Sequence, residues 1–207
     1  MERPILFSTP MVQAILQGKK TMTRRIIKPQ PPQKLQFPYG FVTGSSDKND
    51  IGKFCWTVGD ICDGRTHLVR PRYQKDDTIW VRETWAKVED FKNYAELELD
   101  KDLEFFYKCD DFGKEHVFVD VGVQRWRPSI FMPREACRIK LKITDIRVER
   151  LQEITEEDAK AEGYPGGHSS AKSWFRDLWD KINAKRGFDW YSNEWVWVVT
   201  FERMTDI

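Results

Sequence analysis

The sequence lacks any long apolar run, and this excludes a membrane-spanning helix. None of its segments reaches the length of about 18 consecutive apolar residues that a span requires. The N-terminal residues, Met1 to Pro4, do not have the architecture of a signal peptide. We therefore expect a cytoplasmic protein that has no membrane partner.

Cysteine and histidine are scarce: the chain of 207 residues has four cysteines and three histidines. None of the cysteines belongs to a C-x-x-C pair, and we interpret Cys55, Cys62, Cys109 and Cys137 as reduced cytosolic thiols. A zinc site built from Cys55, Cys62 and His67 would match no standard ligand spacing. We therefore expect no metal and no other cofactor.

The sequence also lacks an excess of charge of either sign. It has 34 Lys and Arg against 33 Asp and Glu, a net charge of +1, so any affinity for nucleic acid would come from a local basic patch. The P-loop, G-x-G-x-x-G and G-x-S-x-G motifs are absent as well, which removes the commonest signatures of nucleotide cofactors and hydrolases. Aromatic residues are plentiful, with nine Trp and 13 Phe, and most of them must lie in the core.

The most informative segment runs from residue 9 to residue 25. Thr9 is a good N-cap, Pro10 a good first helical residue, and Gly18 a suitable left-handed C-cap. A short helix is therefore predicted to end at Gly18. A basic run follows it, because positions 19–28 hold five cations and no acid.

Within this basic run, Thr23 and Arg25 point to the same side of an extended segment, and Lys20 lies on the turn before it. A lysine, a hydroxyl and an arginine at such a corner are typical of an anion-binding or nucleophile-activating site. Basic runs are also common on solvated faces, so a plain surface strand is the alternative.

Strand patterns outnumber helix patterns in the rest of the chain. A capping box, Thr155-Glu156-Glu157-Asp158, opens a short helix that Gly163 closes. A second helix has Trp174, Leu178 and Ile182 at helical spacing. The predicted strands cover residues 78–83, 105–107, 116–123, 137–151 and 195–201.

This series of elements predicts an α+β fold: a small, mostly antiparallel β-barrel with short helices packed outside. Neither an internal repeat nor a convincing linker divides the chain. We therefore predict a single domain over residues 1–207, with variable insertions at about 30–57 and 87–124.

The run Gly18-Lys19-Lys20-Thr21-Met22-Thr23-Arg24-Arg25 resembles the G-x-K-x-x-[ET]-x-R signature of the ASCH domain family, whose members are PUA-like β-barrels tied to RNA metabolism. The resemblance continues through Val58-Gly59-Asp60, residues 80–85, Arg127-Pro128-Ser129, the helix before Gly163 and the last strand. It covers most of the chain outside the two insertions and is greatest for the longer, phage- or prophage-encoded members. It implies a PUA-like fold and a nucleoside or RNA ligand.

One compact bacterial member of this family is an amidohydrolase that deacetylates N4-acetylcytidine, and its motif also has threonine at the sixth position. The resemblance implies that Lys20 is the proton acceptor, Thr23 the nucleophile and Glu162 the proton donor. This chemistry is coherent, because a threonine hydroxyl needs a neighbouring base and a lysine of lowered pKa can supply one. Glu162 is in the last turn of its helix, where the dipole favours a protonated carboxyl. The mechanism requires no metal.

Further residues are candidates for binding the substrate or a nucleic acid. Arg25 could hold a phosphate or a developing oxyanion. Glu83 is either a second carboxylate of the pocket or a structural partner of a cation, and Trp85 is either core or a platform for a base. The loop at residues 125–134 could close over the site or cross the barrel mouth. The candidates are Arg24, Arg25, Glu83, Trp85, Arg127 and Ser129.

These residues support three hypotheses. The first is a metal-independent amidohydrolase that acts on an N-acylated nucleoside. The second is a non-catalytic module that binds RNA or a modified base, and the third is a ribonuclease in which Lys20 and Arg25 stabilise charge at phosphorus. We favour the first, because threonine and not glutamate occupies the sixth motif position.

Overall fold

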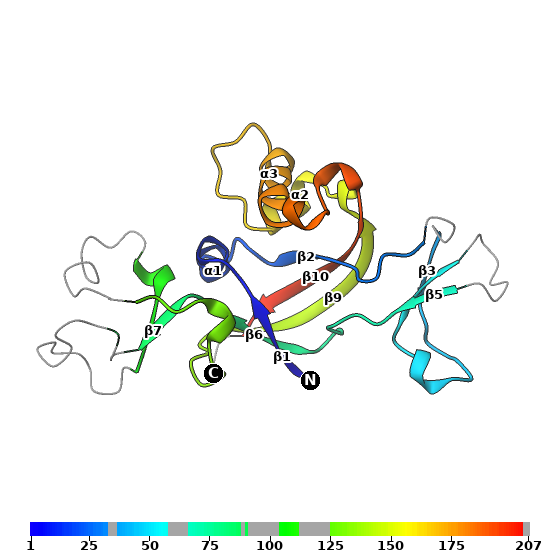
Figure 1. Cartoon of the computed structure of the whole chain (residues 1–207), viewed down its shortest axis with the longest axis horizontal. Helices are drawn as coiled ribbons and strands as arrows, with labels where there is room; N and C mark the ends of the chain where they lie inside the picture. The colour runs from blue at the N-terminus through cyan, green and yellow to red at the C-terminus, as the bar shows by residue number, and fades with distance from the viewer. Residues whose placement is uncertain (33–36, 58–65, 88–89, 91–103, 112–124, 205–207) are drawn as a thin grey trace, which may run out of the picture. The chain divides into compact units, whose positions relative to one another are not determined.

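A computed structural model describes the chain except for residues 33–36, 58–65, 88–89, 91–103, 112–124 and 205–207, which are grey in Figure 1. The chain forms two compact units. Unit 1 consists of Met1–Lys20, Asp77–Lys142 and Glu202–Ile207, and unit 2 consists of Thr21–Asp76 and Ile143–Phe201. The single domain with two insertions remains a prediction.

In its described residues, unit 1 has short strands, one α-helix and two 3-10 helices, and β9 (Lys140–Arg150) enters it through its first residues. Its own elements are β1 (Glu2–Leu6), α1 (Thr9–Leu16), β6 (Thr78–Arg82), β7 (Trp85–Lys87), β8 (Phe105–Tyr107), η4 (Lys108–Asp111) and η5 (Ser129–Phe131). Strand β1 pairs in parallel with β6, and β6 pairs antiparallel with the start of β9. Strands β7 and β8 form a separate antiparallel pair.

Unit 2 contains the rest of β9 and most of β10 (Trp195–Arg203). Its other elements are β2 (Met22–Ile26), β3 (Phe37–Phe41), η1 (Lys48–Asp50), β4 (Phe54–Thr57), β5 (Thr66–Val69), η6 (Leu151–Glu153), α2 (Glu156–Ala161), α3 (Ala171–Asn183), η7 (Ala184–Arg186) and η8 (Trp190–Ser192). Strand β10 lies between β9 and β2 in one sheet, and β2 is the edge strand; the order in the other sheet is β3-β4-β5.

The two faces of β10 pack against different layers of unit 2. Val196 and Val198 share a core with Phe175 and Trp179 of α3, and Figure 1 shows α2 and α3 on this side of β2 and β10. On the opposite face, Trp197 lies 6.1 Å from Phe54 of β4 between ring centroids. This alternation buries both faces of the strand, which explains its nearly continuous apolar sequence.

Most of the predicted elements that fall on described residues are confirmed. The strands predicted at 78–83, 105–107, 137–151 and 195–201 are β6, β8, β9 and β10, whereas the one predicted at 116–123 lies outside the described residues. Helix α2 begins as predicted, because Thr155 Oγ1 accepts a hydrogen bond from the Asp158 N–H at 3.0 Å. The α+β class with mostly antiparallel pairing is also confirmed.

The N-terminal helix starts one residue earlier than predicted. Ser8 is the N-cap of α1, and Thr9 is already helical. Gly18 takes a left-handed conformation with φ +72°, as predicted for the residue that ends this helix.

The helix predicted from Trp174, Leu178 and Ile182 is confirmed as α3. Phe175 and Trp179 are its buried aromatic residues, Trp174 packs against the same core, and Ile182 is 45% exposed. Trp174 and Leu178 each precede a second large apolar residue, and helical spacing alone does not choose between two parallel apolar rows.

The sequence predicted neither a metal site nor a membrane-spanning helix. Among the described residues, no group of three or more His, Cys, Asp and Glu side chains is placed to hold a metal ion. Cys62, one member of the zinc site considered above, lies outside the described residues. The described helices include none with the length and apolarity needed to cross a membrane.

Candidate functional site

Lys20 is a buried cation at the end of unit 1. Its side chain is 2% exposed, and its ammonium nitrogen lies 5.5 Å from the centroid of the Phe7 ring. The backbone N–H of Lys20 donates to the Ala14 carbonyl at 3.0 Å, which folds the chain after Gly18 back onto α1. Lysine is almost never fully buried without a partner or a task, and the neighbouring Lys19 is exposed.

Thr23 and Arg25 lie on one face of β2, and Arg24 lies on the other. The register pairs Thr23 with Val199 and Arg25 with Trp197, whereas Arg24 is opposite Val198. Because side chains alternate along a strand, Arg24 shares the face covered by α2 and α3, and Thr23 shares the face of Trp197. Thr23 is 4% exposed.

Glu162 lies beside the edge of β2. It is the C-cap of α2, and the Thr21 N–H donates to the carbonyl of the preceding residue, Ala161, at 2.9 Å. This bond holds the end of α2 next to the start of the strand. The Glu162 side chain is 3% exposed, and its Oε1 lies 3.5 Å from Nη1 of Arg24.

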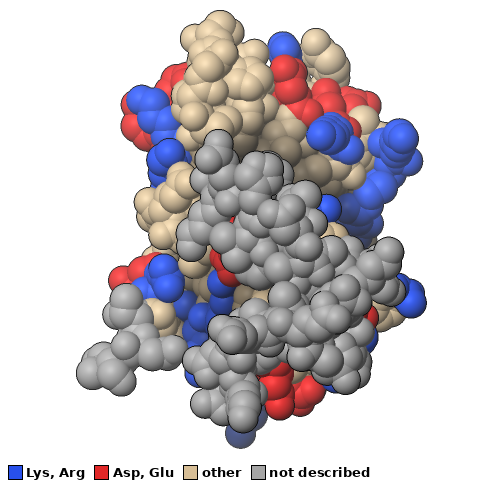
Figure 2. All heavy atoms as spheres, turned by 90° about the vertical axis from the view of Figure 1, so that its left-hand side faces the viewer, with Lys and Arg blue, Asp and Glu red and all other residues tan. Residues whose placement is uncertain are grey.

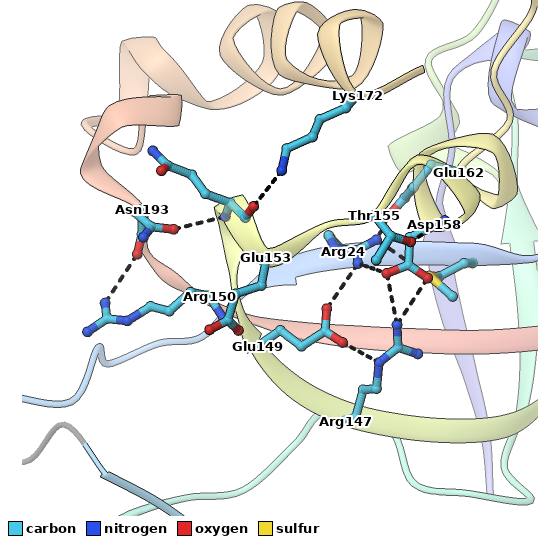
Figure 3. A network of polar contacts seen from close by, with 12 residues as sticks. Arg24, Arg147, Glu149, Arg150, Glu153, Thr155, Asp158, Glu162, Lys172 and Asn193 are labelled. Carbon is cyan, nitrogen blue, oxygen red and sulfur yellow. Dashed lines mark hydrogen bonds and ion pairs between the residues drawn. The ribbon is translucent and has the colours of Figure 1, made fainter. Parts of the chain in front are cut away.

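Arg24 joins three carboxylates in a network that Figure 3 shows. Its Nη2 lies 3.0 Å from Oε2 of Glu149 and 2.6 Å from Oδ2 of Asp158, in addition to the contact with Glu162. Arg147 bonds to Glu149 and to Asp158 from the side opposite Arg24. The side chain of Arg24 is fully buried.

Arg25 is within electrostatic reach of charges from several other segments of unit 2. Burial lowers the pKa of Arg25, the charges of Tyr73 and Glu162 raise it, and the like charges of Arg72 and Arg186 lower it further. Charges of both signs therefore act on Arg25. On the face of the molecule in Figure 2, basic and acidic side chains are likewise interspersed. A half-buried guanidinium such as that of Arg25 can pair with an anionic ligand.

Glu83 belongs to a buried polar network in unit 1. Its side chain is 1% exposed, and it accepts hydrogen bonds from Nε and Nη2 of Arg138, both at 3.0 Å. Arg138 also donates to both carboxylate oxygens of Asp110 and lies 3.9 Å from the centroid of the Tyr107 ring. Cys109 Sγ donates to Oε2 of Glu83 at 3.0 Å. These contacts are those of a structural partner of a cation, which is one of the two roles considered for Glu83.

The Cys109 thiol should make the free energy of unfolding depend on pH in the alkaline range. Burial and the hydrogen bond to Glu83 raise the pKa of Cys109 in the folded chain. Below the pKa of an unfolded thiol, about 8.5, the buried thiol makes its full contribution to the free energy of unfolding. At higher pH the unfolded chain loses its proton first, so the free energy of unfolding falls, by at most about 1.4 kcal/mol per pH unit for one proton. Urea unfolding between about pH 7.5 and 10 measures this slope.

The matched variant is Cys109→Ala, which should have a flatter dependence on pH. Burial also raises the pKa of Tyr107, to about 12, so the contribution of Tyr107 has the same sign but begins only above the ordinary tyrosine value, near about 10. An unchanged slope in Cys109→Ala would show that the thiol is not the group responsible.

Trp85 and Arg127 lie together in unit 1. They form an isolated antiparallel bridge, and the Arg127 guanidinium lies 5.1 Å from the centroid of the Trp85 ring. Trp85 is 3% exposed, so its ring is core and offers no open face to a base. Asp90 accepts from Nε and Nη2 of Arg127 at 2.8 and 3.0 Å. Ser129 begins η5 and is half-buried.

The comparisons with known proteins give one match. No family model matches the chain, and no curated protein matches it. The chain is similar to a crystal structure of an ASCH domain from Lactobacillus crispatus, with 12% sequence identity and a TM-score of 0.40. The match covers 98% of this chain and 79% of the other.

The structure brings together some of the predicted residues. Arg24 and Glu162 are in contact in unit 2, and Arg25 is within electrostatic reach of Glu162. Trp85 and Arg127 form a second group, in unit 1, and Glu83 belongs to the network of Arg138. Sequence reasoning missed Arg72 and Arg186, because single exposed arginines carry no pattern that separates them from the rest of the surface.

Proposed function

We propose that this protein is a metal-independent amidohydrolase that cleaves the amide bond of an N-acylated nucleoside such as N4-acetylcytidine. The observation that carries the proposal is the burial of three polar side chains of complementary chemistry: Lys20, Thr23 and Glu162 are 2%, 4% and 3% exposed. Residues of these types are mostly exposed in folded proteins, and lysine and glutamate are almost never fully buried without a partner or a function.

In the proposed reaction, Thr23 Oγ1 attacks the acyl carbonyl after Lys20, three residues earlier in the chain, removes its proton. The bond from the carbonyl carbon to the exocyclic nitrogen breaks, and the departing amine receives a proton from Glu162. Water then hydrolyses the acyl-threonine and regenerates the hydroxyl. Glu162 recovers its proton from the water of this second step, in which Lys20 also returns its proton to Thr23 Oγ1.

Arg25 is the residue that we assign to the negatively charged part of the substrate or of the intermediate. It shares the face of Thr23 on β2, and the charges of Arg72 and Arg186 act on it together with that of Glu162. A preorganised cation is most effective where charge develops during the reaction. This position supports binding of a phosphate, in a nucleotide or in RNA, or of the oxyanion that forms during attack.

Incubation of the purified protein with N4-acetylcytidine, with cytidine release followed by chromatography, tests the proposal. The wild type should release cytidine and acetate, and Thr23→Ala should lose this activity by at least about 100-fold. Thr21→Ala is the matched control, because Thr21 is exposed and on the same segment. A folded wild type without turnover would overturn the amidohydrolase and leave the binding module or the ribonuclease.

Thr23→Ala also separates the hydrolase from the ribonuclease. A ribonuclease that uses the 2′-hydroxyl of its RNA substrate needs no nucleophile from the protein. RNA cleavage that survives in Thr23→Ala would therefore favour the ribonuclease, whereas RNA binding without cleavage in either protein would favour the binding module.

A further inference from the structure

Unit 1 has a cleft that the proposed reaction does not use. Its volume is about 520 Å³, and residues of β7 and of the segment from Arg125 to Glu135 line it. Volumes of about 300–1,000 Å³ are usual for sites that bind small molecules. The lining residues used below are Trp85, Lys87, Arg125, Pro128, Phe131 and Glu135.

The first observation is a buried hydrogen-bond donor at this cleft. Trp85 is 3% exposed, and its indole nitrogen Nε1 is buried without a hydrogen-bond partner among the described residues. Buried indole N–H groups usually find an acceptor, and an unsatisfied one destabilises the protein. An acceptor atom brought by a ligand would satisfy this group.

The second observation is an exposed aromatic ring at the same cleft. Phe131 is 72% exposed, although an aromatic ring of this size is normally buried. Phe131 is the last residue of η5, and the exposed Pro128 is the N-cap of the same 3-10 helix. Flat apolar surfaces of this kind stack against planar rings.

The third observation is the charge of the lining. Lys87 and Arg125 contribute two cations and Glu135 one acid, while Asp90 already neutralises Arg127 through two hydrogen bonds. The described lining residues therefore have an excess of positive charge. A ligand that carries an anionic group would complement it.

We infer that this cleft binds a nucleotide unit: a planar heteroaromatic ring with a phosphate. A base has both a π-face for Phe131 and, in its plane, acceptor atoms for the Trp85 N–H, and a nucleotide joins these to a phosphate, whereas a peptide supplies acceptors through its backbone carbonyls but has no phosphate for the cations. The phosphate pairs with Arg125 and Lys87. The unit can come from a free nucleotide or from a single strand of nucleic acid.

The test is a titration of the full-length protein with adenosine 5′-monophosphate and with a single-stranded RNA hexamer, by calorimetry at low salt. Neither probe carries an acyl group, so neither can be hydrolysed by the proposed reaction, and the Phe131→Ala variant and the Trp85 resonance described below separate binding in this cleft from binding of the phosphate at Arg25. Phe131→Ala should weaken binding by at least about fivefold, as expected for a lost stacking contact. Ile130→Ala is the matched control, because Ile130 is 56% exposed and does not line the cleft.

The two probes distinguish the sources of the nucleotide. Equal affinity for both indicates a free nucleotide, and binding of the hexamer alone, weakened by salt, indicates a strand. A second readout is the NMR resonance of the Trp85 indole N–H, which is assigned from its absence in Trp85→Phe. This resonance should shift when the ligand binds. No binding of either probe, an unshifted resonance, or equal losses in Phe131→Ala and Ile130→Ala would overturn the inference.

Discussion

Replacing Lys20 by arginine should abolish the hydrolysis of N4-acetylcytidine although the positive charge is kept. Arginine stays protonated at any pH that the protein survives, so it cannot remove the proton from Thr23. A general base contributes typically about 100- to 10,000-fold to a rate, and we expect a loss in this range in kcat for both Lys20→Arg and Lys20→Ala. Steady-state kinetics by chromatography of released cytidine measures it.

Lys19→Ala is the control for this substitution, because Lys19 is the adjacent lysine and is exposed whereas Lys20 is buried. It should retain wild-type turnover. Thermal unfolding of each variant shows whether it is folded, which matters because the Lys20 side chain lies over Phe7. A folded Lys20→Arg variant with wild-type kcat would exclude Lys20 as the base, whatever the identity of the substrate.

Replacing Arg24 by methionine should destabilise the protein by about 3–5 kcal/mol, the usual cost of breaking a buried ion-pair network from one side. The guanidinium is fully buried between Glu149, Asp158 and Glu162. Its loss leaves three carboxylates close together, with Arg147 as the remaining cation of the network (Figure 3). For a chain of this length, the midpoint of thermal unfolding should fall by roughly 6–20 °C.

Arg147→Met is the matched control for Arg24→Met. Arg147 contacts two of the same carboxylates, but its side chain is 35% exposed, so solvent compensates for its loss. We expect an effect of at most about 1 kcal/mol. Equal destabilisation by the two variants would show that burial of Arg24 is not the source of its contribution.

Local sequence determined the elements that position the site, because each depends on residues a few positions apart. The left-handed Gly18 ends α1, Thr155 starts α2, and the basic run that follows Gly18 becomes β2. The alternation of β2 could likewise be predicted, since the side-chain period of a strand is fixed by its backbone. These features made Lys20 and Thr23 candidates before any tertiary structure was considered.

Tertiary structure alone decided which charges meet, because ion pairs join residues far apart in the chain. Glu162 became a candidate through the family resemblance, but its contact with Arg24 depends on α2 ending beside the edge of β2. Glu83 had two possible roles, in a pocket or as the partner of a cation, and only folding supplied Arg138 as its partner. The same holds for the buried face of α3 and for the cleft at Trp85: burial depends on long-range packing, which a sequence pattern records only in part.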